Sequence, residues 1–236
     1  AHLNLGIGLE ASGDAEGAIR CYETALELDP QEVFARYNLG KLLFSRGAPD
    51  RAAPLLMDAL RLKPDFPDAL VVLAAIQEAL ASPADALATL QAALRLRPDD
   101  RLALRNCGVL LGKLRRWAEA ESCLRRAIAA DTDDAEAACA LGNALVHLGQ
   151  SEDAASWYRT ALRVRPDYPE ALCALGCILV DRGNLEQARP LLARAIELRP
   201  AFAEAHVGLG NLRHAERHLA EAAASYRRAI AIDAHF

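Results

Sequence analysis

Three cysteines form the most suggestive chemical pattern in this sequence. Cys139 and Cys173 occupy the same column of a repeating pattern, and Cys177 follows Cys173 after one helical turn. Thiolates joined by a further ligand such as His147 would suit zinc. The alternative is that each cysteine is a small, slightly polar residue that packs on a helix. We expect the packing role, and we expect the chain to need no metal and no cofactor.

Other patterns typical of enzymes do not hold up when their context is considered. Gly6-x-Gly8-x-x-Ala11 has the letters of a dinucleotide-binding loop. Such a loop needs a preceding strand, whereas this segment has a helical pattern. The sequence contains no Gly-Lys-Ser/Thr loop, no His-Glu-x-x-His pair and no nucleophile elbow. We therefore predict that the chain is not an enzyme.

Charge and hydropathy argue against two classes of partner. The net charge is -5 and the pI is about 5.7, whereas binding to a phosphate backbone needs a surplus of Lys and Arg on one face. We expect no nucleic-acid partner. No long apolar run and no leader-like start occurs, so neither a membrane span nor a signal peptide is visible; the first residue, Ala1, leaves open that a leader was removed. The six cysteines lie within helical patterns, which favours reduced thiols and a cytoplasmic location.

Small residues recur along the chain at a fixed interval of 34. Three columns of the repeat hold only alanine, as at Ala137, Ala154 and Ala161, and another holds glycine or alanine, as at Gly142. Small residues in fixed columns indicate points where helices approach closely. Large apolar residues recur around them at helical spacing, so each repeat is predicted to contain two amphipathic helices.

Glycines and prolines mark the predicted ends of these helices. The first helix should end at a glycine, which readily takes a left-handed conformation; the residues are Gly13, Gly47, Gly149 and Gly183. The second helix should end before a proline such as Pro166. In the repeat from residue 67 the turn reads Ala81-Ser82-Pro83, where Ser82 suits a helix N-cap.

This pattern resembles the tetratricopeptide repeat family along essentially all 236 residues. The repeat from residue 169 supplies the small, large and proline residues of the family motif at Leu172, Leu175, Gly176, Leu179, Ala188, Leu192, Ala195 and Pro200. The resemblance implies an all-α fold, a right-handed superhelical solenoid of antiparallel helix pairs. A single array is expected, with a partial unit at 1–32 and full units at 33–66, 67–100, 101–134, 135–168, 169–202 and 203–236. Position 11 of the motif becomes Gln77 and Arg213 in two units, which we expect to pack less tightly.

The resemblance also implies where a partner binds. In the family the first helix of each pair lines a concave groove. The ligand-binding residues expected on this basis are Phe34, Tyr37, Asn38, Lys41, Val71, Val72, Arg105, Asn106, Glu136, Asn143, His147 and Asn211. The earlier residues are mostly apolar with two cations, whereas the later units add acidic and smaller residues. We therefore expect a peptide whose hydrophobic anchors lie toward the N-terminal units and whose basic residues lie toward the other end.

The expected function is a non-catalytic scaffold that binds a peptide segment or a partner surface in this groove. The alternative is the substrate-recruiting arm of a larger enzyme, such as an O-linked N-acetylglucosamine transferase-like glycosyltransferase. That alternative is motivated by ends typical of an excerpt and by a partial asparagine ladder at Asn4, Asn38 and Asn106. A catalytic region after Phe236 would favour it. Self-association through the terminal repeats, around Tyr226 to Ile232, is a third expectation.

Overall fold

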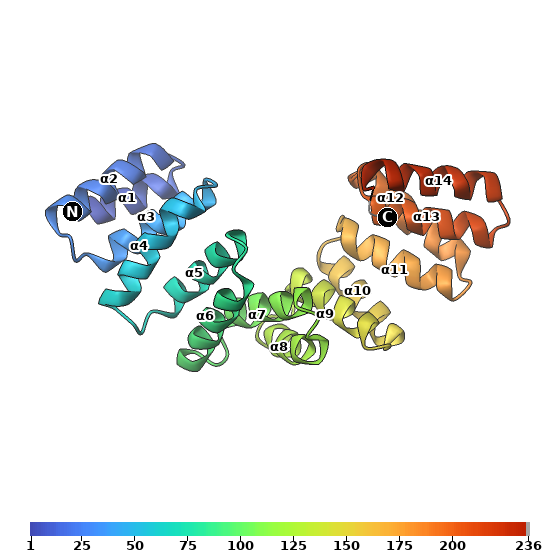
Figure 1. The fold of residues 1–236 in the computed structure, drawn as a ribbon, viewed down its shortest axis with the longest axis horizontal. Coiled ribbons are helices and arrows are strands. Elements are labelled where there is room, and N and C mark those ends of the chain that lie inside the picture. Colours follow the sequence, from blue (N-terminus) through green and yellow to red (C-terminus); the bar gives the residue numbers. More distant parts are fainter. Residues whose placement is uncertain (235–236) are drawn as a thin grey trace. The chain divides into compact units, whose positions relative to one another are not determined.

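The computed structural model describes residues 1–234, in which fourteen α-helices alternate with short turns and no strand is formed (Figure 1). His235 and Phe236, the end of the last predicted unit, lie outside the described residues. The all-α repeat fold expected from the sequence is confirmed. The helices are α1 (His2–Ala11), α2 (Ala15–Leu28), α3 (Val33–Ser45), α4 (Pro49–Leu62), α5 (Pro67–Ala79), α6 (Pro83–Leu96), α7 (Arg101–Lys113), α8 (Trp117–Ala130), α9 (Ala135–His147), α10 (Ser151–Val164), α11 (Pro169–Asp181), α12 (Leu185–Leu198), α13 (Ala203–Ala215) and α14 (Leu219–Ile232).

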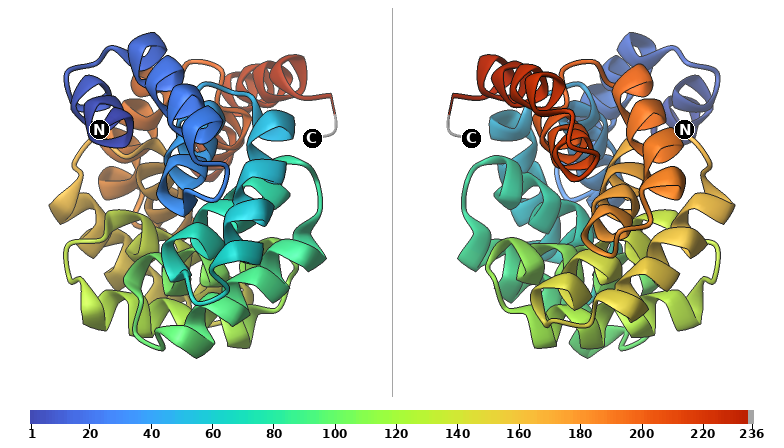
Figure 2. Two further views of the ribbon diagram at one scale, coloured as in Figure 1. Left: turned by 90° about the vertical axis from the view of Figure 1, so that its left-hand side faces the viewer. Right: turned by 90° about the vertical axis from the view of Figure 1, so that its right-hand side faces the viewer.

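The contacts divide the chain into two compact units, an N-terminal unit of residues 1–110 and a C-terminal unit of residues 111–236, with the boundary inside α7. In the N-terminal unit α3 contacts both α1 and α5, and in the C-terminal unit α11 contacts both α9 and α13. Second helices of successive pairs make no such contact within either unit, as far as residues 1–234 show. Each unit therefore has an inner layer of first helices. Figure 2 shows the helix pairs from two further sides.

The alanine columns lie where helices cross. Ala137, Ala154 and Ala161 are fully buried, and so, apart from Ala1, are almost all of their counterparts in the other repeats. A methyl group is the largest side chain that these crossings admit, because interiors are packed to the density of organic crystals. The expectation of close helix approach is confirmed at these columns.

The glycine column makes room for a large side chain from the second helix of the same repeat. A Cβ atom on Gly142 would lie 2.5 Å from Cε1 of Tyr158, and one on Gly176 would lie 2.8 Å from Cγ of Leu192. Both distances are shorter than any carbon contact that packing tolerates. The tyrosine and leucine side chains therefore fill the space that each glycine leaves.

The turns between paired helices share one backbone conformation whether or not glycine is present. The four predicted glycines have φ between 75° and 86°, and Ala81, Arg115 and Arg217 at the equivalent positions have φ of 57°, 60° and 66°. In the turn at Gly149, the N–H of Gln150 donates to the carbonyl of Leu145 at 2.8 Å, which is the long hydrogen bond of a Schellman motif. The close packing of the helix pair thus imposes the left-handed conformation even on residues that carry a Cβ.

The predicted helix ends next to proline and serine are partly confirmed. α10 ends at Val164, shortly before Pro166, as expected. α6 begins at Pro83 with Ser82 at its N-cap, but the Ser82 side chain makes no capping hydrogen bond. The serine therefore marks the helix start by position alone.

The two polar residues at position 11 find polar partners. The hydroxyl of Thr89 donates to Oε1 of Gln77 at 2.8 Å. Arg213 lies 3.2 Å from the carboxylate of Glu216, which also accepts from Arg189 on the preceding helix pair at 2.5 Å. Hydrogen bonds and ion pairs thus replace apolar contact at these two places.

No helix among residues 1–234 combines the length and the apolar character needed to cross a membrane.

Candidate functional site

Four of the predicted binding residues lie on α3 in the N-terminal unit, where aromatic rings gather. The Phe66 ring lies 5.6 Å from the ring of Phe34 and 4.8 Å from that of Tyr37, measured between centroids. The Lys63 ammonium lies 5.0 Å from the Phe34 centroid, a distance at which the cation is attracted to the ring face. Burial raises the pKa of Tyr37, and the nearby Asp68 raises it further. The Phe34 side chain remains exposed, so the cluster presents an apolar surface with a cation at its edge.

The predicted residues on α5 and α7 are partly accessible, as are Tyr37, Asn38 and Lys41 on α3. Val71, Val72, Arg105 and Asn106 are all half-buried. Val72 packs against the hydrophobic core of the N-terminal unit. Part of the Val72 side chain therefore packs in the core, and only the remaining part is accessible to a ligand.

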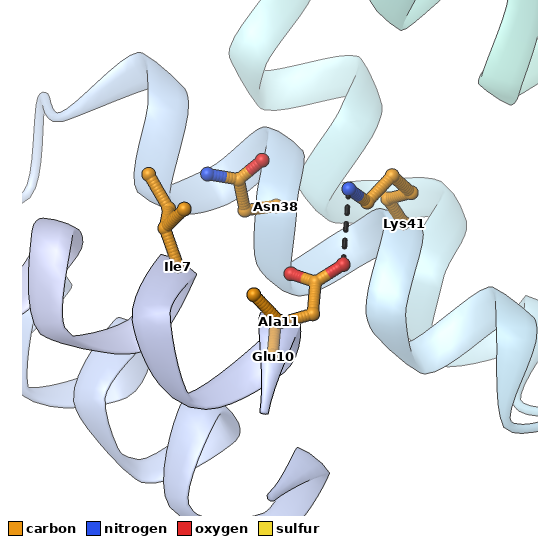
Figure 3. A pocket seen from close by; sticks show the side chains of 5 residues that line it. All are labelled: Ile7, Glu10, Ala11, Asn38 and Lys41. Atoms are coloured by element: carbon orange, nitrogen blue, oxygen red, sulfur yellow. Dashed lines mark ion pairs between the residues drawn. The ribbon is translucent and has the colours of Figure 1, made fainter. Parts of the chain in front are cut away.

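A hollow of about 350 Å³ lies between α1 and α3 and is lined by Ile7, Glu10, Ala11, Asn38 and Lys41 (Figure 3). The Lys41 ammonium lies 3.0 Å from Oε1 of Glu10. The hydroxyl of Tyr22 donates to the other carboxylate oxygen of Glu10 at 2.9 Å. Two of the predicted residues, Asn38 and Lys41, are thus brought together with an acid that sequence reasoning missed.

Periodicity alone could have found Glu10. It occupies the same column of the repeat as Phe44, at a motif position that faces the groove in the family.

In the C-terminal unit two of the predicted asparagines accept hydrogen bonds from tyrosines on the second helix of the same repeat. The hydroxyl of Tyr158 donates to Oδ1 of Asn143 at 2.7 Å, and that of Tyr226 donates to Oδ1 of Asn211 at 2.8 Å. Both asparagines are exposed. Within residues 1–234 neither amide NH₂ group has a protein acceptor. Because its oxygen accepts a hydrogen bond from the tyrosine, each carboxamide is held in a fixed orientation and presents two N–H donors.

The tyrosines that orient these amides occupy a column of large residues in the repeat. Burial raises the pKa of Tyr158, so its hydroxyl stays protonated and remains a donor. The equivalent residue is leucine in four other repeats, at Leu56, Leu90, Leu124 and Leu192. The signal available in the sequence was a tyrosine in this column together with an asparagine at the ninth position of the same repeat.

His147 has a different contact from the one considered at the sequence level. Its ring stacks on Trp117 at the start of α8, with centroids 3.9 Å apart and planes inclined by 10°. The stack joins consecutive helix pairs within the C-terminal unit. His147 therefore covers the indole face instead of joining the three cysteines.

The acidic residue Glu136 is paired within its own repeat. Its carboxylate lies 3.6 Å from Arg165, and the equivalent Glu170 lies 2.6 Å from Arg199. Each arginine also lies over an aromatic ring, 4.7 Å from the Tyr168 centroid in the first case. Two of the acidic residues of the C-terminal unit thus already have an arginine partner.

The three cysteines lie in and beside the helix interfaces of the C-terminal unit. Cys139 and Cys173 are buried and Cys177 is half-buried. A Cβ atom on Gly208 would lie 2.9 Å from Sγ of Cys177, so this sulfur fills space between α11 and α13. No group of three or more His, Cys, Asp or Glu side chains within residues 1–234 is arranged to hold a metal ion.

The Cys139 thiol should make the fold sensitive to alkaline pH. Burial raises its pKa to about 12, against an ordinary value of 9.0. The unfolded chain therefore loses this proton near pH 9 while the folded chain keeps it. The stability that the protonated, buried thiol contributes to the folded state is fully present below pH 9 and is lost as the pH rises toward 12. When the pH is raised from 8.5 to 10.5, the free energy of unfolding should fall for both proteins. We expect the fall to be about 2 kcal/mol smaller for Cys139→Ala than for the wild type.

This difference is measured by urea unfolding of both proteins across that pH range. Parallel pH profiles of Cys139→Ala and the wild type would show that the buried thiol is not linked to folding.

Comparisons with known proteins place the repeats in a family. A family profile described as "Tetratricopeptide repeat" matches residues 3–68, 108–169 and 173–235, and a second profile of the same description matches residues 43–106. A comparison with curated protein sequences finds no match.

Several solved structures share the fold at low sequence identity. A structure of PilF from Pseudomonas aeruginosa has a TM-score of 0.75 at 20% identity, over 85% of this chain and 91% of that one. A structure of MamA has a TM-score of 0.62 at 23% identity, over 70% and 91%. YrrB, described as a TPR protein with an unusual peptide-binding site, has a TM-score of 0.61 at 22% identity, over 75% and 92%. At these identities the likeness concerns the fold alone.

Proposed function

Because this chain belongs to the tetratricopeptide repeat family, we propose that it is a non-catalytic interaction scaffold that binds an extended peptide segment along the first helices of its C-terminal unit. Support comes from the exposed donors that Asn143 and Asn211 present on α9 and α13. An extended peptide offers a backbone carbonyl at every residue, and a carboxamide N–H is a suitable donor to it.

The tyrosine contacts reduce the cost of binding. A free asparagine side chain on a surface rotates, and fixing it on a ligand costs conformational entropy. Tyr158 and Tyr226 have already fixed the two amides through bonds of 2.7 and 2.8 Å. The backbone contact requires no particular side chain in the ligand, so specificity must come from other contacts.

The experiment begins with selection of peptides from a random display library on the wild-type protein. A labelled selected peptide is then titrated against the double variant Asn143→Ala/Asn211→Ala by fluorescence anisotropy. Each lost hydrogen bond is worth about 1 kcal/mol, so the dissociation constant should rise roughly 30-fold. Asn184→Ala removes an exposed asparagine in the turn before α12 and should leave it unchanged.

Tyr158→Phe separates orientation from contact. This variant keeps Asn143 but removes the hydroxyl that holds it, so a weakening of about fivefold is expected. Selected peptides that bind the double asparagine variant as tightly as the wild type would show that the proposed face is not the binding site.

A further inference from the structure

The hollow between α1 and α3 contains an ion pair whose two partners are held very differently. Oε2 of Glu10 accepts from the Tyr22 hydroxyl at 2.9 Å. The Tyr22 side chain is fully buried and packs against the backbone of Gly6, where a Cβ would come within 2.5 Å of its ring. The carboxylate is therefore anchored to the core of the N-terminal unit.

Lys41 is the less restrained partner of the pair. Its side chain is 41% exposed, against 27% for Glu10. Its ammonium is placed by the carboxylate at 3.0 Å and by the face of the Tyr37 ring, whose centroid is 5.9 Å away. A lysine stem with four rotatable carbons can swing into solvent at little cost. Replacement of the Lys41 ammonium by a cation of the ligand would leave the anchored Glu10 carboxylate in place.

The surroundings of the ion pair fit a ligand side chain. Ile7 and Ala11 supply apolar contacts for an alkyl stem, and Asn38 supplies a carboxamide at the same hollow (Figure 3). Its volume of about 350 Å³ falls within the range of about 300 to 1,000 Å³ that small ligands occupy. A carboxylate recognises ammonium and guanidinium groups, and the centroid of the Tyr37 ring lies 5.9 Å from the Lys41 ammonium that is bound there now.

We propose that this hollow is a binding site for a lysine or arginine side chain of a peptide ligand, with Glu10 as the acceptor and Lys41 as an internal occupant that the ligand displaces. The inference that the bound cation belongs to a peptide rests on the proposed peptide-binding function. It departs from the charge order expected from sequence, which placed the basic residues of the ligand toward the C-terminal end. The acidic residue that recognises a ligand cation thus lies in the N-terminal unit.

A small-molecule titration tests the hollow without requiring peptide binding. N-acetyl-lysine methylamide is added to the wild type, Lys41→Met and Glu10→Gln, and binding is followed by NMR through the side-chain amide signals of Asn38 and the ring signals of Tyr37. N-acetyl-norleucine methylamide, which has no ammonium, is the matched probe. A partly exposed ion pair is worth up to about 1 kcal/mol, so the lysine probe should bind Lys41→Met about fivefold more tightly than the wild type.

Three results would overturn the proposal. They are equal binding of the two probes to Lys41→Met, binding of the lysine probe to Glu10→Gln as tight as to the wild type, and no gain on removal of Lys41. The amide region of the NMR spectrum reports the fold of each variant in the same samples. Failure here with intact dependence of selected peptides on Asn143 and Asn211 would refute the cation site alone. Loss of that peptide dependence would instead refute the proposed function.

Discussion

Gly142→Ala should lower the free energy of unfolding by about 2 kcal/mol, within the range of about 1 to 3 kcal/mol that overpacking costs. The added methyl group would lie 2.5 Å from Cε1 of Tyr158. That ring cannot move easily, because its side chain is 1% exposed and its hydroxyl is bonded to Asn143. The loss is measured from the denaturant midpoint followed by circular dichroism.

Gly112→Ala is the matched control in the same C-terminal unit. Its new Cβ would have an ordinary contact, 3.5 Å from the Trp117 ring, and it lies within α7. Alanine is a better helix former than glycine by about 0.5 to 1 kcal/mol. The two substitutions should therefore change stability in opposite directions. An unchanged midpoint for Gly142→Ala would contradict the fit between the glycine column and the tyrosine.

Glu216→Ala should also lower the free energy of unfolding, by about 2 kcal/mol, because it breaks a partly buried ion-pair network. The Glu216 side chain is 8% exposed and lies 2.5 Å from Arg189 and 3.2 Å from Arg213. Its removal leaves Arg189 and Arg213 with the more exposed carboxylates of Glu186 and Glu221, at 3.7 Å and 3.3 Å. Breaking a fully buried pair costs about 3 to 5 kcal/mol. We expect less because Arg189 is 42% exposed and Arg213 is 27% exposed, which lets water solvate both.

Glu186 provides a control on the same arginine. It lies 3.7 Å from Arg189, but its side chain is 91% exposed. Exposed pairs of this kind contribute about 0 to 1 kcal/mol, so Glu186→Ala should leave the denaturant midpoint nearly unchanged. Equal losses for Glu186→Ala and Glu216→Ala would show that burial does not decide the strength of these ion pairs.

The parts of the fold that the sequence predicts are those set by the size of single residues. Ala154 and its counterparts are small because a helix crosses there, and Gly149 adopts φ of 76° because a turn follows α9. Such size requirements are local and recur in every repeat, so the sequence shows the same residue types many times. The helix ends before the prolines are predictable for the same reason.

The partners of individual side chains were not predictable, because they depend on how two helices are oriented. The bond between Tyr158 and Asn143 joins the two helices of one repeat, and the ion pair between Lys41 and Glu10 joins two repeats. The periodic pattern indicated that Asn143 and Lys41 belong to first helices. It could not distinguish a side chain left free for a ligand from one already paired, as Glu136 is with Arg165.

The most direct test of peptide binding at Asn143 is a double-mutant cycle between the protein and a selected peptide. Each backbone amide of the peptide is replaced in turn by an ester, whose carbonyl is a weaker acceptor, and binding is measured to the wild type and to Asn143→Ala. We predict that one ester position weakens binding to the wild type but not to Asn143→Ala, with a coupling energy of about 1 kcal/mol. Additive effects at every ester position would contradict a hydrogen bond from Asn143 to the peptide backbone.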